Sequence, residues 1–169
     1  MQPDTDVDKL IEKMAKDLDA KLQAFPADQV LMIGIHTGGV WIAEKLHQLL
    51  KLPLPLSIMD ISFYRDDFSR IGMNPQVKPS ELPESVDDKH IVLVDDILHT
   101  GRTIRAAMNE IFDYGRPASV TLAVLGVRSG RELPIQADVA GTELDLKDDE
   151  HVKLSGPEKL KLTVVKVAS

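Results

Sequence analysis

The feature that most constrains the fold is a strand-like run that ends in two adjacent carboxylates and leads at once toward a helix. Residues 91–94, Ile-Val-Leu-Val, are aliphatic and mostly β-branched, as in a strand buried on both faces. Asp95 and Asp96 follow at its carboxyl end, where ligands bind in open α/β sheets. After a turn over 100–103, apolar residues recur at helical spacing over 104–112. The pattern predicts a parallel sheet with a ligand site at this edge.

The turn, Thr100-Gly101-Arg102-Thr103, suits a phosphate group. Backbone N–H groups of a tight turn that leads into a helix N-terminus form a cradle for a phosphate dianion. Carboxylates beside that cradle would repel the phosphate, so Asp95 and Asp96 are expected to accept hydrogen bonds from sugar hydroxyls instead. The natural ligand for such a pair of subsites is a ribose that carries a 5′-phosphate.

The rest of the chain alternates between helical and strand patterns. We expect helices over 6–24, 40–50 and 103–114, and strands over 30–35, 54–61, 91–95, 120–125 and 160–167, the last at an edge or in a small appendage. This alternation predicts an α/β fold with a central, mainly parallel sheet and helices on both faces. Residues 62–90 contain three prolines and no periodicity, which is typical of a functional or mobile connection.

Composition sets the class and removes several functions. A chain of 169 residues fits a single domain over 1–169, and the absence of cysteine excludes disulfides and thiolate chemistry. The five histidines show no metal-ligand spacing. A net charge of −7, from 27 acids and 20 bases, disfavours nucleic-acid binding. No apolar run is long enough to span a membrane and the first residues are acidic, so we expect a soluble, cytoplasmic protein.

Residues 91–103 resemble the phosphoribosyl-pyrophosphate (PRPP) signature of the type I phosphoribosyltransferases. Further segments resemble one branch, the bifunctional pyrimidine-operon regulator / uracil phosphoribosyltransferase (PyrR) family, over about residues 30 to 142. They include Tyr64-Arg65-Asp66-Asp67, Gly115-Arg116-Pro117 and Arg131-Glu132-Leu133-Pro134-Ile135. The resemblance implies the type I phosphoribosyltransferase fold with a small hood, a flexible active-site loop over about 62–88, and a homo-oligomer.

The same resemblance implies roles for individual residues. Asp95 and Asp96 would bind the ribose 2′- and 3′-hydroxyls, and Arg65 would reach the pyrophosphate; these three are the expected catalytic residues. The 5′-phosphate would be held by His99, Thr100, Gly101, Arg102 and Thr103, the pyrophosphate by His36, Thr37, Gly38 and Gly39, and the base by Gly126, Val127 and Arg128. Mg²⁺ would be bound mainly through oxygens of PRPP and water, without protein ligands.

The function implied is transfer of phosphoribose from PRPP to a base, first uracil, giving UMP and pyrophosphate, with regulation of pyrimidine genes as a second activity. Two departures favour a different interpretation, a PRPP- or UMP-sensing regulator with little catalysis. Gly38 stands where the family usually has arginine, and the base loop carries Val127, Ser129 and Gly130 in place of its acid, glycine and histidine. RNA is a conceivable partner that the net charge disfavours, and a protein partner stays open. A purine-base transferase is the third interpretation, which His99 disfavours.

For three side chains the sequence allows two different roles. His99 either shapes the rim of the pocket or transfers a proton, because an unperturbed histidine titrates near neutrality. His36 either contacts pyrophosphate or caps the next helix. Trp41 is more typical of a core or interface position than of a platform on which a base stacks.

Overall fold

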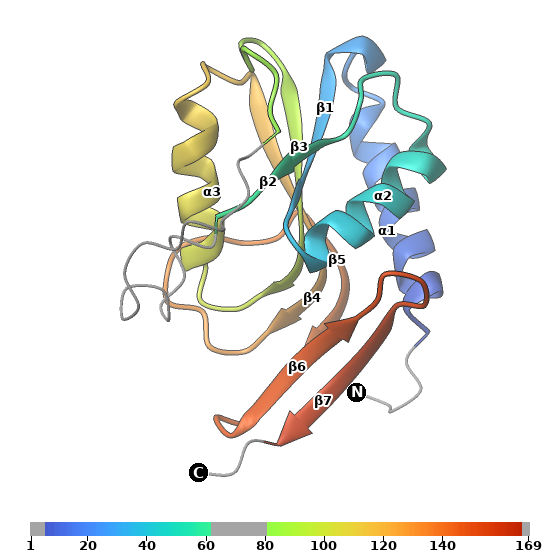
Figure 1. Ribbon diagram of the computed structural model, residues 1–169, viewed down its shortest axis with the longest axis vertical. Helices are drawn as coiled ribbons and strands as arrows, with labels where there is room; N and C mark the ends of the chain where they lie inside the picture. Colours follow the sequence, from blue (N-terminus) through green and yellow to red (C-terminus); the bar gives the residue numbers. More distant parts are fainter. Residues whose placement is uncertain (1–5, 62–80, 167–169) are drawn as a thin grey trace.

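The computed structural model describes residues 6–61 and 81–166 (Figure 1). Its centre is a five-stranded sheet in which every neighbouring pair of strands is parallel. In spatial order the strands are β2 (Ser57–Met59), β1 (Val30–Ile35), β3 (His90–Leu98), β4 (Ser119–Arg128) and β5 (Val139–Leu144). The predicted parallel sheet is therefore confirmed.

Helices cover both faces of this sheet, as predicted. Helices α1 (Val7–Leu22) and α2 (Gly38–Leu50) pack on one face, and α3 (Arg102–Phe112) packs on the other (Figure 1); a short 3₁₀ turn, η1 (Ala27–Gln29), precedes β1. Alternate residues of β3 serve the two cores: Val92 and Val94 face α1 and α2, whereas Ile91 and Leu93 face α3. Strand β3 is thus buried on both sides, which explains its uninterrupted apolar sequence.

The register of the strands gathers their carboxyl ends at one edge. Gly34 of β1 lies beside Val94 of β3, and Ile97 of β3 lies beside Gly126 of β4. Helix α2 starts at Gly38, directly after β1, and α3 starts at Arg102, directly after β3. Two helix N-termini and the two acids of β3 therefore meet at this edge, where α/β proteins bind ligands.

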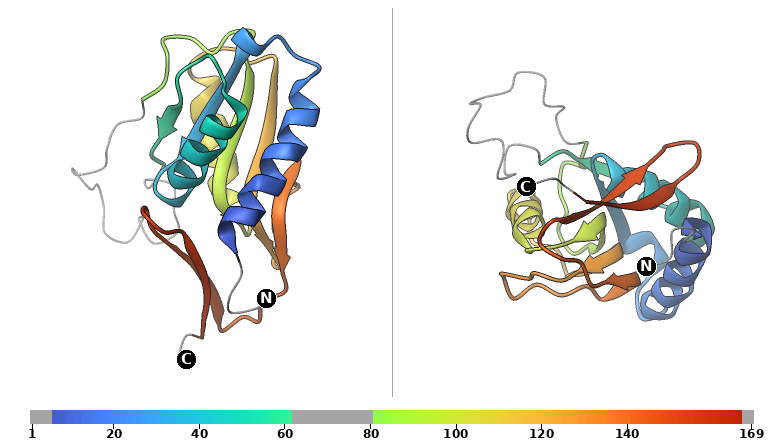
Figure 2. Two further views of the ribbon diagram at one scale, coloured as in Figure 1. Left: turned by 90° about the vertical axis from the view of Figure 1, so that its right-hand side faces the viewer. Right: turned by 90° about the horizontal axis from the view of Figure 1, so that it is seen from below.

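Strands β6 (Glu150–Ser155) and β7 (Lys161–Lys166) form an antiparallel hairpin separate from the main sheet. The hairpin lies across the carboxyl-end edge of the sheet, as the view from below shows (Figure 2, right). Its inner side contributes Leu154, Leu160 and Leu162 to the core shared with α1 and α2. This hairpin is the predicted appendage, although only β7 was expected from the sequence.

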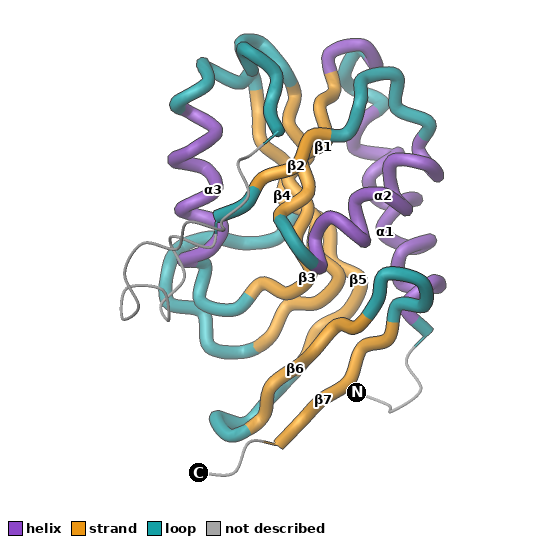
Figure 3. The backbone as a smooth tube through the Cα atoms, in the orientation of Figure 1, coloured by secondary structure: helices purple, strands orange, loops and turns teal. Residues whose placement is uncertain are grey.

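Several predicted boundaries are wrong. The strand expected over 54–61 covers only Ser57–Met59, because Pro53 and Pro55 have no N–H to donate (Figure 3). Strand β3 continues to Leu98, so both acids belong to the strand rather than to the turn after it. Strands β5 and β6 were not predicted.

The loop expected over about 62–88 falls in two parts. Residues 62–80 lie outside the described residues. Glu81 exchanges backbone hydrogen bonds of 2.7 and 3.2 Å with Ile58, and the side chain of Val86 is buried in the core beside α3. The expected loop therefore returns to the core well before residue 88.

Both outer strands of the main sheet are partly covered on their outer side. Strand β2 is three residues long and follows two prolines. On β5, at the opposite edge, the carbonyl of Ala140 accepts a 2.9 Å hydrogen bond from Lys13 Nζ of α1. Among the described helices, none is long and apolar enough to cross a membrane.

Candidate functional site

The two acids of β3 are held by the backbone that follows them. Asp95 Oδ1 accepts a 2.8 Å hydrogen bond from the N–H of Asp96, and Asp96 Oδ1 accepts one of 2.7 Å from the N–H of Ile97. Asp95 is only 4% exposed, whereas Asp96 is half-buried and lines a cavity. Each carboxylate thus has one oxygen bonded to the backbone, which fixes its orientation.

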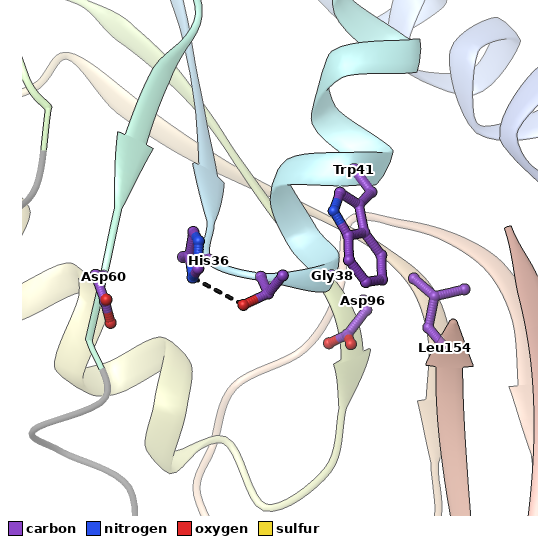
Figure 4. A pocket seen from close by; sticks show the side chains of 7 residues that line it. His36, Gly38, Trp41, Asp60, Asp96 and Leu154 are labelled. Atoms are coloured by element: carbon purple, nitrogen blue, oxygen red, sulfur yellow. Dashed lines mark hydrogen bonds between the residues drawn. The ribbon is translucent and has the colours of Figure 1, made fainter. Parts of the chain in front are cut away.

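A cavity of about 290 Å³ lies at the N-terminus of α2, between the sheet edge and the hairpin (Figure 4). We call it the α2 cavity; its lining residues are His36, Thr37, Gly38, Trp41, Asp60, Asp96 and Leu154. The Thr37 hydroxyl and His36 Nδ1 lie 2.8 Å apart and share a hydrogen bond. Among the described residues the lining contains two carboxylates and no lysine or arginine, so a polyanion would enter it more readily with a cation.

The first residues of α2 approach β3 too closely for a side chain. A Cβ added to Gly38 would lie 2.5 Å from Asp96 Oδ2, and one added to Gly39 would lie 2.7 Å from the carbonyl oxygen of Val94. Real Cβ atoms do not come this close to a neighbouring atom. The two glycines therefore let the backbone N–H groups of the loop sit directly beside the acid pair.

The turn before α3 is a second anion-binding feature. Gly101 has φ = 97°, a left-handed conformation that glycine adopts without strain, and the Thr100 hydroxyl accepts a 3.1 Å hydrogen bond from the N–H of Arg102, the first residue of α3. The first turn of α3 contains no acid, so no negative side chain there offsets the helix dipole. The loop is braced from outside: Thr100 O accepts 3.0 Å hydrogen bonds from the N–H groups of Glu132 and Leu133, and Arg102 Nε contacts Glu132 Oε1 at 2.9 Å.

A second cavity, of about 230 Å³, lies at the end of β4. This β4 cavity is lined by Leu98, His99, Val127, Arg128, Arg131, Ile135, Gln136 and Ala137. Of the three residues expected at the base, Val127 and Arg128 line this cavity, whereas Gly126 does not: it is buried in the sheet, where a Cβ would meet Ile97 and Leu144. Among the described residues no carboxylate lines this cavity.

Arg128 is the most unusual side chain of the β4 cavity. It is only 9% exposed, its Nη1 donates a 3.2 Å hydrogen bond to the carbonyl oxygen of Glu150, and its buried Nε has no hydrogen-bond partner among the described residues. Partial burial of the ring and the positive charge of Arg128 lower the pKa of His99, with His151 adding to the effect and Glu132 opposing it. The β4 cavity therefore combines a fixed cation with a histidine that favours its neutral form.

The structure brings most of the predicted residues to one edge. His36, Thr37, Gly38 and Asp96 share the α2 cavity, and His99, Val127 and Arg128 share the β4 cavity. The 100–103 turn connects the carboxyl end of β3 to α3. Arg65 lies outside the described residues. Sequence reasoning missed Asp60 and Leu154. Asp60 follows β2 at the carboxyl edge and could have been found by that position, whereas nothing in the sequence places Leu154 there.

A parallel sheet with an acid pair and an acid-free helix N-terminus at its carboxyl edge is typical of α/β enzymes that bind phosphorylated ligands. Comparison with known proteins makes the class specific. The phosphoribosyl transferase domain model matches residues 5–158, and the chain belongs to the phosphoribosyltransferase family.

Its curated relatives include proteins named "Bifunctional protein PyrR". The protein from Nitrosococcus oceani is 59% identical over 160 residues, covering 94% of this chain and 90% of that one. The protein from Pseudomonas syringae pv. syringae is 54% identical over 154 residues, covering 91% of each chain.

Solved structures confirm the type I phosphoribosyltransferase fold. The purine phosphoribosyltransferase from Pyrococcus horikoshii is 25% identical, with a TM-score of 0.61 and 82% of each chain covered. A hypoxanthine-guanine phosphoribosyltransferase from Bacillus anthracis is 17% identical, with a TM-score of 0.68, covering 85% of this chain and 84% of that one.

Proposed function

We propose that this protein transfers the phosphoribosyl group of PRPP to uracil, forming UMP and pyrophosphate, and that it also regulates pyrimidine genes. The observation that carries the proposal is the acid pair of β3, held by its own backbone between the α2 cavity and the N-terminus of α3. Membership of the phosphoribosyltransferase family and similarity to the PyrR proteins support it.

In this proposal each part of PRPP has its own subsite. Asp95 and Asp96 accept hydrogen bonds from the ribose hydroxyls. The turn over 100–103 and the first turn of α3 hold the 5′-phosphate, with His99 at its side. The loop over 36–39 holds the pyrophosphate at the N-terminus of α2. Arg65, implied by the resemblance and outside the described residues, would add a cation at the pyrophosphate.

The reaction requires stabilisation of opposite charges on the two sides of the breaking bond. Positive charge develops on the ribose beside the Asp95–Asp96 pair, while negative charge grows on the departing pyrophosphate at the N-terminus of α2. The donor set fits Mg²⁺, because the carboxylates of Asp60 and Asp96 are hard oxygen groups that face the same cavity. Mg²⁺ held mainly by oxygens of PRPP would neutralise the leaving group there.

The β4 cavity is the proposed base subsite. A buried arginine donates to carbonyl oxygens and repels amino groups, so Arg128 favours an oxo-base such as uracil over adenine. The second candidate function is a PRPP- or UMP-sensing regulator with little catalysis. It is favoured by the lack of lysine and arginine among the described residues of the α2 cavity, which weakens stabilisation of the leaving group.

We further propose a single domain over residues 1–169 that acts as a homo-oligomer in the cytoplasm. The family resemblance implies the oligomer. RNA is a possible regulatory partner, although the net charge of −7 means that any such contact would need a local basic surface.

The test is a base screen. Purified protein with Mg²⁺ and PRPP is offered uracil, orotate, hypoxanthine, guanine and adenine separately, and nucleotide formation is followed by chromatography. We expect UMP from uracil alone. If no base is converted while PRPP or UMP binds by calorimetry, the sensing function replaces the catalytic one.

The site itself is tested by the double variant Asp95→Asn/Asp96→Asn, which keeps the shape of both side chains and removes their charge. We expect loss of PRPP binding by at least about 100-fold, since two charge-assisted hydrogen bonds are worth roughly 1.5–3 kcal/mol each. Asp113→Asn, at the exposed far end of α3, is the matched control. Intact PRPP affinity in the double variant would refute the assignment of the ribose subsite.

A further inference from the structure

We propose that the β6–β7 hairpin is a strap whose two ends contact the two proposed substrate subsites. Its turn end contacts the α2 cavity through Trp41 and its open end contacts the β4 cavity through Arg128, and both residues act as positioning residues. PRPP and UMP would then stabilise different ends of the same hairpin. This inference rests on the proposed function, because it takes the α2 cavity as the pyrophosphate subsite and the β4 cavity as the base subsite.

The turn end of the hairpin is tied through Trp41. This residue lies in the first turn of α2, three positions after Gly38, and lines the α2 cavity together with Leu154 of β6 (Figure 4). A Cβ added to Gly156, which follows β6, would lie 3.0 Å from Trp41 Cε3 and 2.6 Å from Leu160 Cδ2. The hairpin turn therefore packs directly on the indole ring, and the same ring forms a wall of the pyrophosphate subsite.

The open end of the hairpin is tied through Arg128. Its Nη1 donates to the carbonyl oxygen of Glu150, the first residue of β6, and the same side chain lines the β4 cavity. The Nε of the same side chain is buried and has no hydrogen-bond partner within the described residues. A base carbonyl that accepts from Arg128 would hold the guanidinium in the position that supports Glu150.

Between these two ends the strands pair only with each other within the part of the chain that the structure describes. Leu154 and Leu162 face the core, whereas His151, Lys153 and Val165 are exposed on the outer side. A two-stranded hairpin has little stability of its own and depends on what it packs against. A ligand that fixes Trp41 or Arg128 would therefore reduce local unfolding at the nearer end of the hairpin. The conformation of the outer surface of the hairpin would then depend on which ligand is bound.

The experiment is hydrogen exchange at single-amide resolution, on the full chain, alone, with Mg²⁺ and PRPP, and with UMP. We expect PRPP to slow exchange by at least about threefold at amides of residues 154–161. We expect UMP to act instead on residues 150–152 and 164–166. Trp41 is the only tryptophan of the chain, so its fluorescence reports occupation of the α2 cavity independently.

The variant Gly156→Ala distinguishes the contact at the turn end of the hairpin from the contact at its open end. The new methyl group pushes the turn away from Trp41, so the effect of PRPP on residues 154–161 should fall while the effect of UMP on the open end stays. Leu154→Val is the second variant if Gly156→Ala does not fold. Val165→Thr, on the outer side and 48% exposed, is the matched control and should respond as the unaltered protein does.

The outcomes distinguish this inference from the proposed function. If calorimetry shows no binding of PRPP or UMP, the proposed function fails and the strap fails with it. If both ligands bind but the hairpin exchanges at an unchanged rate, or both protect the same amides equally, only the strap is wrong.

Discussion

At the scale of single residues, Gly38 shows how a missing side chain can determine binding. Gly38→Ala places a methyl group against the Asp96 carboxylate, which must then move away from the ribose subsite. We expect PRPP affinity to fall by about tenfold or more, roughly 1.4 kcal/mol. Alanine is a better helix residue than glycine, so the free energy of unfolding should change little.

The Gly38→Ala prediction is measured by calorimetry with Mg²⁺ and PRPP and by urea unfolding. Glu44→Ala, on the exposed side of the same helix, serves as the control and should bind PRPP normally. Unchanged PRPP affinity in Gly38→Ala would mean that the contact between α2 and Asp96 is not part of the site.

His99 gives a prediction on pH. Its pKa is lowered from 6.5 in the folded protein, so between the lowered value and 6.5 the unfolded chain binds more protons than the folded one. The stability that His99 contributes is therefore fully present above pH 6.5 and is lost as the pH falls through the lowered pKa. In His99→Gln the free energy of unfolding should decrease less between pH 7.5 and 5.5.

Urea unfolding at the two pH values checks this prediction. His151→Gln is an internal test, because removing the charge of His151 should move the pKa of His99 back toward 6.5 and reduce the loss partly. An equal decrease in the unaltered protein and in His99→Gln would contradict the prediction.

The individual site residues were predictable where a short motif carries them. The acid pair and the 100–103 turn could be placed because strand, acids, glycine and helix follow each other directly in sequence. Leu154 could not, because a leucine in an alternating strand looks the same whether it faces a core or a cavity. Gly126 is expected in the base pocket, whereas in the structure it lies inside the sheet, packed against Ile97 and Leu144, and does not line the β4 cavity.

At the scale of secondary-structure elements, α1 stabilises the sheet by packing on it but lines neither cavity. Leu18 is 0% exposed in the core between α1 and the sheet. Leu18→Ala should reduce the free energy of unfolding by about 2–5 kcal/mol, the usual cost of a cavity at a buried leucine. PRPP affinity should stay the same, because α1 does not line either cavity.

Urea unfolding measures the effect of Leu18→Ala, with Lys16→Ala on the exposed side of α1 as control, expected within about 0.5 kcal/mol of the unaltered protein. A large loss of PRPP binding in folded Leu18→Ala would show that α1 affects the site.

The elements were predicted well where burial is uniform. Strands β1 and β3 read as continuous apolar runs because both faces are covered, and α1 repeats apolar residues at helical spacing. Strand β5 mixes glycine and polar residues with a few aliphatic ones, and in β6 only Val152 and Leu154 alternate with polar residues, a run too short to predict a strand. Their strand structure depends on pairing with β4 and with β7, which local sequence does not show.

At the scale of the whole molecule, ligand binding should appear as stability. A ligand at 100 times its dissociation constant stabilises the folded state by about 2.7 kcal/mol. For a domain of this size that corresponds to a rise in Tm of roughly 5–10 °C with Mg²⁺ and PRPP. Calorimetric scans should show a smaller rise after Mg²⁺ is removed with EDTA, and none for Asp95→Asn/Asp96→Asn. Equal rises in all three samples would contradict the proposed site.

The two outer strands of the main sheet limit how copies of this chain can meet. Strand β2 offers three residues after two prolines, and on β5 a lysine already occupies the carbonyl of Ala140. Few backbone groups at either edge are therefore open to pairing with a strand of a neighbouring chain. This arrangement disfavours edge-to-edge aggregation at high concentration. The homo-oligomer proposed above would then use helices, loops or the β6–β7 hairpin rather than the edges of the main sheet, so single surface substitutions there should weaken it.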